Sequence, residues 1–142
     1  TQIRHLLSQG RVDEAAEMLG RYHQLKARVV QGIARGRELG FPTANLQVPA
    51  HCLVPANGVY AVYAIVQDKR YPAVANIGTR PTFGGGERNI EVHLLDFSAD
   101  LYGEEISVQF VQRLRDERHF PSAKALRAQI EQDIARAREI LE

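Results

Sequence analysis

Several short β-like segments follow one another closely between residues 22 and 114, and one helical pattern comes after them. Gly58–Val66 is apolar on both faces, and Glu104–Leu114 alternates apolar with polar positions, as half-buried strands do. The expected strands are Tyr22–Gln31, Gly58–Val66, Tyr71–Ile77, Asn89–Phe97 and Glu104–Leu114, with the second pairing with the third and the fourth with the fifth. This pattern predicts a mainly β protein, a small antiparallel barrel capped by a helix.

Helical spacing of apolar residues marks both ends of the chain. The last helix is expected over Ser122–Leu141, with one apolar stripe formed by Leu126, Ile130, Ile134, Ala137 and Leu141. Two short helices are expected in the first twenty residues, ending at Gly10 and Gly20. Two segments, Gly32–Pro55 and Thr79–Arg88, are predicted to be long loops, and long loops in a compact domain are often functional.

The composition excludes several classes of protein. Eighteen Lys and Arg residues against seventeen Asp and Glu residues leave a net charge of +1, which favours neither a nucleic-acid partner nor a membrane partner. The longest apolar stretch, Val59–Val66, is too short to span a bilayer. A single cysteine, Cys52, excludes an internal disulfide, so we expect a cytoplasmic protein. The opening residues are not a natural start, and we expect a fragment of a longer chain.

The first long loop has the composition of a phosphate-binding segment. Gly32, Gly36 and Gly40 allow backbone N–H groups to approach an anion, and Arg35 and Arg37 add forked positive charges. The loop is not a Walker motif, because no Gly-Lys-Ser/Thr follows. Glycine spacing alone leaves a mobile surface loop as an equal alternative.

Thr43 and Asn45 follow in the same loop. Their side chains point the same way if the segment is extended, and both offer neutral oxygen atoms. Mg²⁺ suits such a site, because it takes one or two protein oxygens and completes its shell with water and phosphates. The alternative is a capping threonine and a turn asparagine.

Glu91 is a carboxylate in an otherwise apolar strand. It shares a strand face with His93 and Leu95, and a buried carboxylate there needs a partner or a chemical role. From the strand alone, a structural ion pair is the more common explanation, and a packed His93 is more common than a catalytic one. The charged segment Leu114–Phe120 is either a solvated connector or a lid whose aromatic ring packs on a planar ligand.

Taken together, these segments resemble the riboflavin kinases. The motifs Gly-Phe-Pro-Thr-Ala-Asn at 40–45, Asn-Ile-Gly-Thr-Arg-Pro-Thr-Phe at 76–83, Glu-Val-His-Leu-Leu-Asp-Phe at 91–97, Leu-Tyr-Gly-Glu at 101–104 and the segment 114–120 occur in this order in that family. The match is similar to the carboxy-terminal module of bacterial bifunctional riboflavin kinase/FAD synthetases and covers about residues 22–141. The resemblance implies a six-stranded Greek-key barrel with a terminal helix.

The resemblance also implies an activity and a role for each segment. The activity is transfer of the γ-phosphoryl group of ATP to riboflavin, giving FMN and ADP. Glu91 is implied as the catalytic base, and Thr43 and Asn45 as the residues that bind Mg²⁺ and nucleotide. Phosphate binding is implied for Gly32, Arg35, Gly36 and Arg37, and flavin binding for Arg115, Glu117, Arg118 and Phe120.

The head of the chain extends the resemblance. Thr1-x-Ile3-Arg4 is similar to the end of the nucleotidyltransferase motif of the FMN adenylyltransferase module that precedes the kinase in such proteins. Residues 1–21 are therefore expected to be linker helices and a remnant of that module, and residues 22–142 the kinase domain.

Two alternatives from other functional classes remain at this point. One is a flavin- or nucleotide-binding barrel without catalytic activity, which differs from a kinase in the role of Glu91 and in metal dependence. The other is an oligonucleotide-binding module, which the near-neutral charge disfavours.

Overall fold

The computed structural model describes residues 2–30, 41, 43–48, 52–82, 85–97 and 100–142. Within these residues, two short helices come first, then six strands, then a long helix. Their bounds are α1 Gln2–Ser8, α2 Val12–Leu19, β1 His23–Val30, β2 Ala44–Gln47, β3 Gly58–Val66, β4 Lys69–Thr82, β5 Gly85–Leu94, β6 Glu105–Arg115 and α4 Ala123–Leu141.

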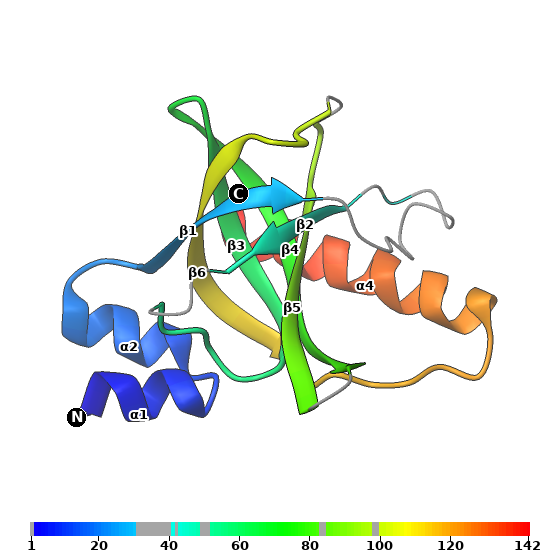
Figure 1. The fold of residues 1–142 in the computed structure, drawn as a ribbon, viewed down its shortest axis with the longest axis horizontal. Coiled ribbons are helices and arrows are strands. Elements are labelled where there is room, and N and C mark those ends of the chain that lie inside the picture. The colour runs from blue at the N-terminus through cyan, green and yellow to red at the C-terminus, as the bar shows by residue number, and fades with distance from the viewer. Residues whose placement is uncertain (1, 31–40, 42, 49–51, 83–84, 98–99) are drawn as a thin grey trace.

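The strands form a closed antiparallel barrel in the order β1-β2-β5-β4-β3-β6, with β6 paired to β1 (Figure 1). This confirms the predicted mainly β class and the six-stranded barrel. The expected pairing of the fourth and fifth predicted strands is wrong, because β5 pairs with β2 and β4 while β6 pairs with β1 and β3. The residues between β5 and β6 are therefore a connection between strands on different parts of the wall, not a hairpin turn.

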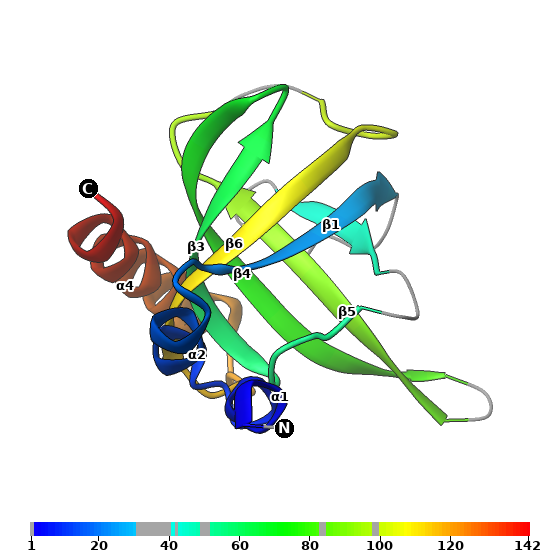
Figure 2. The ribbon, with the colours of Figure 1, turned by 90° about the vertical axis from the view of Figure 1, so that its left-hand side faces the viewer.

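Two predicted loops contain strand structure. β2 lies within the expected loop Gly32–Pro55, and its four residues join β1 to β5 in the wall of the barrel. The expected loop Thr79–Arg88 is wrong, because β4 and β5 continue as a paired ribbon to the pair Thr82 and Gly85. Figure 2 shows this ribbon projecting beyond the rest of the barrel. The inter-strand hydrogen bonds stabilise this segment as strands, although its local sequence has no strand pattern.

Side chains on alternate positions fill the barrel. In β1 the buried positions are Leu25, Ala27 and Val29, which alternate with more exposed residues. β3 is buried on both faces: Tyr60, Val62 and Ala64 join the interior, and Val59 and Ala61 lie in a second cluster that includes Ala137 and Leu141 of α4. The continuous apolar run of β3 therefore reflects an interior on one side and a helix on the other.

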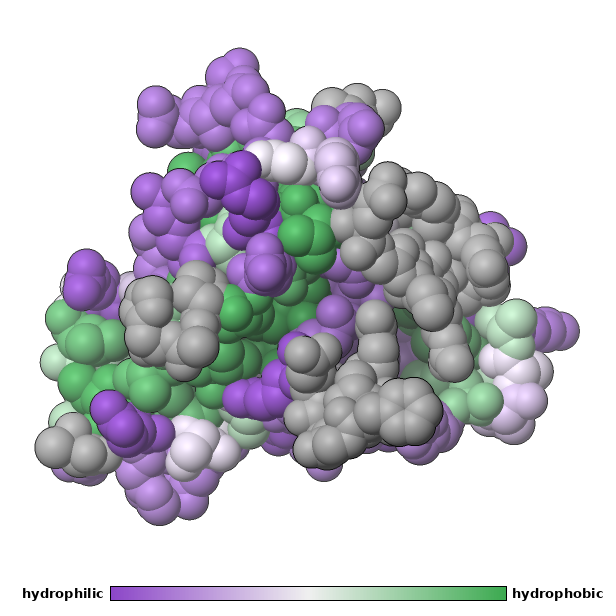
Figure 3. Space-filling view, viewed as in Figure 1, coloured by the Kyte–Doolittle hydropathy of each residue, from purple (hydrophilic) through white to green (hydrophobic). Residues whose placement is uncertain are grey.

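The amino-terminal helices cover one end of the barrel. Leu6, Leu7, Val12 and Ala15 belong to the same apolar core as the strands, and the N–H of Ala56 donates to the carbonyl of Leu7 (3.0 Å). Figure 3 shows apolar surface running from these helices toward the middle of the barrel. Both helices are followed by glycines with positive φ, Gly10 and Gly20, as predicted. The division of the chain at residues 21 and 22 stays a prediction.

Helix α4 lies on the outside of the barrel (Figure 2). It begins after Ser122, whose hydroxyl accepts from the N–H of Ala125 (3.1 Å), and its last turn is held by the Tyr63 hydroxyl, which donates to the Leu141 carbonyl (2.7 Å). The helix is confirmed, but its buried residues are Asp133, Ala137 and Leu141, so Asp133 is buried and Ile134 only partly. Within the described residues, no helix has the length and hydropathy needed to cross a membrane.

Candidate functional site

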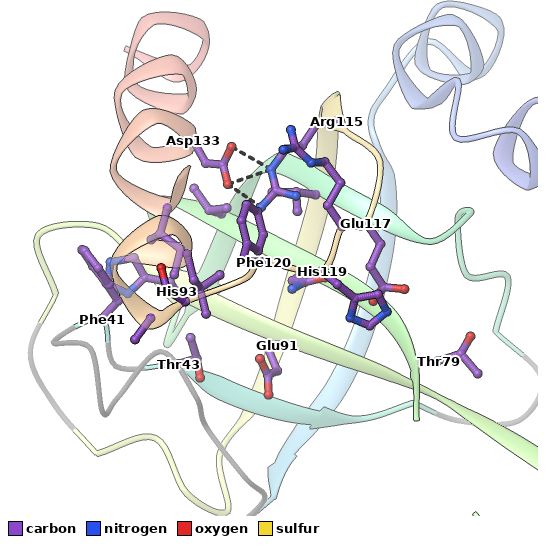
Figure 4. Close-up of a pocket in the computed structure, with 18 residues that line it drawn as sticks. Phe41, Thr43, Thr79, Glu91, His93, Arg115, Glu117, His119, Phe120 and Asp133 are labelled. Carbon is purple, nitrogen blue, oxygen red and sulfur yellow. Dashed lines mark hydrogen bonds and ion pairs between the residues drawn. The ribbon is translucent and has the colours of Figure 1, made fainter. Parts of the chain in front are cut away.

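A cavity of about 600 Å³ lies between the outer face of the barrel and the cover formed by residues 115–120 and α4. Figure 4 shows Arg115 and Phe120 on one side of this cavity and Glu91 and Thr43 on the other. The lining includes Thr43, Asn76, Thr79, Glu91 and His93 from the barrel side, Arg115 from the end of β6, Glu117–Phe120 from the segment that follows, and Leu126, Ile130 and Asp133 from α4. The cavity has apolar walls, and several polar side chains point into it, as in small-molecule binding sites.

Glu91 lies in the middle of the barrel wall and faces outward into the cavity. Its neighbours Ile90 and Val92 are fully buried in the interior, so the alternation of the strand turns Glu91 to the opposite face. In the register of the sheet, Glu91 stands opposite Asn45 of β2 and Asn76 of β4. Directly opposite residues of antiparallel strands share a face, so the carboxylate is flanked on both sides by carboxamides.

Thr43 and Asn45 carry buried oxygen atoms for which no protein hydrogen bond is found within the described part of the chain. These atoms are Oγ1 of Thr43 and Oδ1 of Asn45, and Asn45 is only 6% exposed. A buried polar atom without a protein partner costs free energy unless water or a ligand satisfies it. Neutral hard oxygens beside a carboxylate are a donor set that fits Mg²⁺. Among the described residues, no cluster of three or more His, Cys, Asp or Glu side chains offers a metal site.

An aromatic pair forms one end of the cavity. Phe41 packs edge-to-face against His93, with ring centroids 5.9 Å apart, and both side chains line the cavity. His93 is therefore a packed histidine, in agreement with the interpretation favoured from the sequence. Phe41 was not singled out as a site residue, although it belongs to the motif that contains Thr43 and Asn45.

The end of β6 and the segment that follows it are held against α4. Arg115 and Asp133 form a salt bridge (Nη2 to Oδ2, 2.9 Å), and the Arg115 guanidinium lies 5.5 Å from the centre of the Phe120 ring. Glu117 crosses over Gly78 of β4, where an added Cβ would clash with the Glu117 carboxylate. All four predicted flavin-binding residues, Arg115, Glu117, Arg118 and Phe120, therefore line the cavity.

A hydrogen-bond network supports the wall on the β4 side. The Asn57 side chain donates to the Thr79 hydroxyl (2.9 Å) and accepts from Arg88 Nε (3.2 Å), and its carbonyl accepts from Arg113 Nη2 (2.5 Å). Burial lowers the pKa of Arg88, which stays protonated and also donates to the carbonyls of Val54 and Pro55. The network ties the cavity to the end of the barrel that the amino-terminal helices cover.

The predicted site residues are brought together to different degrees. Thr43, Glu91, Arg115 and Glu117–Phe120 line one cavity, and Asn45 stands beside Glu91 on the next strand. Gly32, Arg35, Gly36 and Arg37 lie outside the described residues. Sequence reasoning missed Asn76, Thr79, His119 and Asp133 as cavity residues. Asp133 had a signal, because it falls at helical spacing from Ile130 and Ala137 within the apolar stripe.

Comparisons with known proteins agree with this site. The sequence model of the family "Flavokinase: Riboflavin kinase" matches residues 19–141. A bifunctional riboflavin kinase/FMN adenylyltransferase of Pseudomonas fluorescens is 45% identical over 97% of this chain and 44% of its own length. The chain therefore spans less than half the length of this curated relative.

Two solved structures share the fold. A riboflavin kinase from Trypanosoma brucei has a TM-score of 0.64 and 28% identity, over 83% of this chain and 76% of its own. A protein from Streptococcus pneumoniae, described as a macrolide-efflux protein, has a TM-score of 0.93 and 39% identity, over 96% of this chain and 45% of its own.

Proposed function

Because this chain belongs to the riboflavin kinase family, we propose that it transfers the γ-phosphoryl group of ATP to the terminal ribityl hydroxyl of riboflavin, giving FMN and ADP. The observation that carries the proposal is the position of Glu91. Its carboxylate faces a cavity that also contains Thr43 and an aromatic-bearing cover segment. A site for a flavin hydroxyl and a phosphate donor needs a proton acceptor, a charge-neutralising group and a wall for a planar ring.

Glu91 acts on the acceptor hydroxyl. It accepts a hydrogen bond from the terminal ribityl hydroxyl, orients that oxygen toward the γ-phosphorus, and takes its proton as the new P–O bond forms and the bond to the ADP oxygen breaks. Carboxylates are weak bases. In a loose phosphoryl-transfer transition state the proton leaves late, so positioning of the hydroxyl contributes as much as basicity.

Thr43 and Asn45 hold the metal ion and the nucleotide. Their buried oxygens, for which the described residues supply no hydrogen bond, are the support for this assignment. Bound there with ATP as co-substrate, Mg²⁺ supplies charge neutralisation at the phosphate oxygens. Backbone N–H groups around Gly32 and Gly36, with Arg35 and Arg37, bind the phosphate chain, and Phe120 with its neighbours Arg115, Glu117 and Arg118 covers the flavin.

The whole protein is proposed to have a second module. The P. fluorescens relative is named for both activities, and this chain spans 44% of its length. We infer that residues 1–21 are the remnant of an FMN adenylyltransferase module and its linker, with α1 and α2 as the connection to the kinase barrel.

The reaction products test the function. With riboflavin, ATP and Mg²⁺, this chain is expected to accumulate FMN and ADP, and no FAD or pyrophosphate. Phosphoryl transfer needs attack at the γ-phosphorus and adenylyl transfer needs attack at the α-phosphorus, so one base and one metal site aligned for the first do not serve the second. Chromatography with mass detection distinguishes the outcomes. FAD would overturn the assignment to a kinase module, and unreacted riboflavin that still binds would favour a non-catalytic flavin-binding barrel.

A further inference from the structure

A buried ion pair links α4 to the segment that covers the cavity. Asp133 Oδ2 lies 2.9 Å from Nη2 of Arg115, and both carboxylate oxygens are 3.1 Å from its Nε. The Asp133 and Arg115 side chains are only 6% and 16% exposed. Gln129, one turn earlier on α4, donates to Oδ1 of Asp133 (3.0 Å). These contacts restrict the guanidinium to one plane and one rotation.

The Arg115 guanidinium also contacts the segment that follows β6. Its Nη1 donates to the carbonyl of Asp116 (3.0 Å), and its guanidinium lies 5.5 Å from the centre of the Phe120 ring. Arg118 approaches the same ring at 5.4 Å. Guanidinium groups at this distance attract an aromatic ring and favour particular ring orientations. Arg115 therefore connects Asp133 of α4 to the Phe120 ring at the cavity (Figure 4).

A buried ion pair needs a reason other than stability. Desolvation of two charges offsets most of their attraction, and apolar residues of similar volume are often as stabilising. What an ion pair with several hydrogen bonds adds is a defined geometry. Here the arginine with the defined geometry contacts one aromatic side chain, Phe120, on the wall of the cavity.

We propose that Asp133 is a positioning residue for flavin binding, which acts by fixing Arg115 and, through it, the ring of Phe120 against the planar ring system of the substrate. This inference rests on the proposed riboflavin kinase function. In this inference, Arg115 contributes to flavin binding by holding Phe120. Asp133 of α4 is added to the residues that determine the affinity for riboflavin. Asp133 itself takes no part in phosphoryl transfer.

The test separates flavin affinity from catalysis. Asp133→Asn keeps the size of the side chain and removes its charge. It is expected to raise the riboflavin Kd, measured by quenching of flavin fluorescence, by roughly tenfold, as expected for a misplaced aromatic contact. KM for riboflavin should rise in parallel, while KM for ATP and kcat stay within about twofold. If Asp133 has a purely structural role, the variant should have a lower melting temperature, while the riboflavin Kd and KM of the folded protein stay unchanged.

Asp96→Asn is the matched control. Asp96 also pairs with an arginine of α4, Arg138 (2.8 Å), but this pair is exposed on the surface and does not contact Phe120. Asparagine also tolerates the positive φ of residue 96. The control should bind riboflavin like the unmodified chain. If Asp96→Asn weakens binding as much as Asp133→Asn, the effect belongs to the attachment of α4 in general and the inference is wrong.

A double-mutant cycle tests the route through Phe120. Phe120→Leu should weaken riboflavin binding, and adding Asp133→Asn should then cost little more, because the ring that Asp133 positions is gone. Full additivity would overturn the inference. If Asp133→Asn folds poorly, the pair Arg115→Met with Asp133→Leu removes both charges together, and it should bind riboflavin about tenfold more weakly while staying folded. An unmodified chain that fails to bind riboflavin would instead overturn the proposed function and this inference with it.

Discussion

Replacing Glu91 with glutamine is expected to lower turnover by about 10²–10⁴-fold, the range usual for a positioned acid or base. Glutamine has the same size and keeps a hydrogen-bonding side chain between Asn45 and Asn76, so the sheet register and the cavity should be preserved. What is lost is the proton acceptor for the ribityl hydroxyl. Steady-state kinetics beside the riboflavin and nucleotide dissociation constants give the measurement.

A second glutamate provides the control. Glu105→Gln changes an exposed carboxylate at the start of β6 that pairs with Lys26 (3.5 Å) and is not part of the cavity lining. It should leave turnover unchanged. A folded Glu91→Gln protein with near-normal turnover would remove Glu91 from the mechanism. If Glu91 is instead a structural ion-pair member, its replacement should lower the melting temperature and leave activity per folded molecule unchanged.

Thr43→Ala and Asn45→Ala are each expected to raise the Mg²⁺ concentration needed for half-maximal turnover by about 10–100-fold, the loss typical when a group supporting a metal site is removed. Both residues carry buried oxygens for which the described residues supply no hydrogen bond. Removing one of two protein ligands leaves fewer fixed oxygens for the metal. Magnesium titrations of turnover and of ATP binding measure the effect.

The matched control for this pair lies on β2, the strand that contains Asn45 and begins one residue after Thr43. Gln47 ends β2 with an exposed side chain, so Gln47→Ala tests the general cost of trimming this strand. Its magnesium titration should superimpose on that of the unmodified chain. Superimposable titrations for Thr43→Ala and Asn45→Ala would instead show that both residues are structural and that the metal is held elsewhere.

The sequence alone determined the elements with a strong local signal. The continuous apolar run Gly58–Val66 is the strand β3 with the same bounds, and the stripe that ends at Leu141 is α4. Glycine at positions 10 and 20 ended both short helices because only a residue that tolerates positive φ fits there. The ordered motifs also carried the family, and with it Thr43, Glu91 and the segment 115–120 as members of one site.

The tertiary structure decided which strands pair. β2 has four residues and little alternation, and it is a strand because β1 and β5 supply its hydrogen bonds. β5 and β6 are consecutive yet do not pair, because closing the barrel places β6 between β3 and β1. Strand pairing of this kind joins residues that are distant in sequence. The alternation of apolar and polar residues along a strand does not show which other strand it pairs with.

The tertiary structure also decided what surrounds each site residue. The sequence identified Glu91 as an unusual carboxylate, but its position between Asn45 and Asn76 follows from the register of three strands. It identified Arg115 as part of a charged segment, but its salt bridge to Asp133 follows from the packing of α4 on the barrel. Residue type and spacing determine which groups can do chemistry, whereas their neighbours are set by long-range packing, which no local pattern encodes.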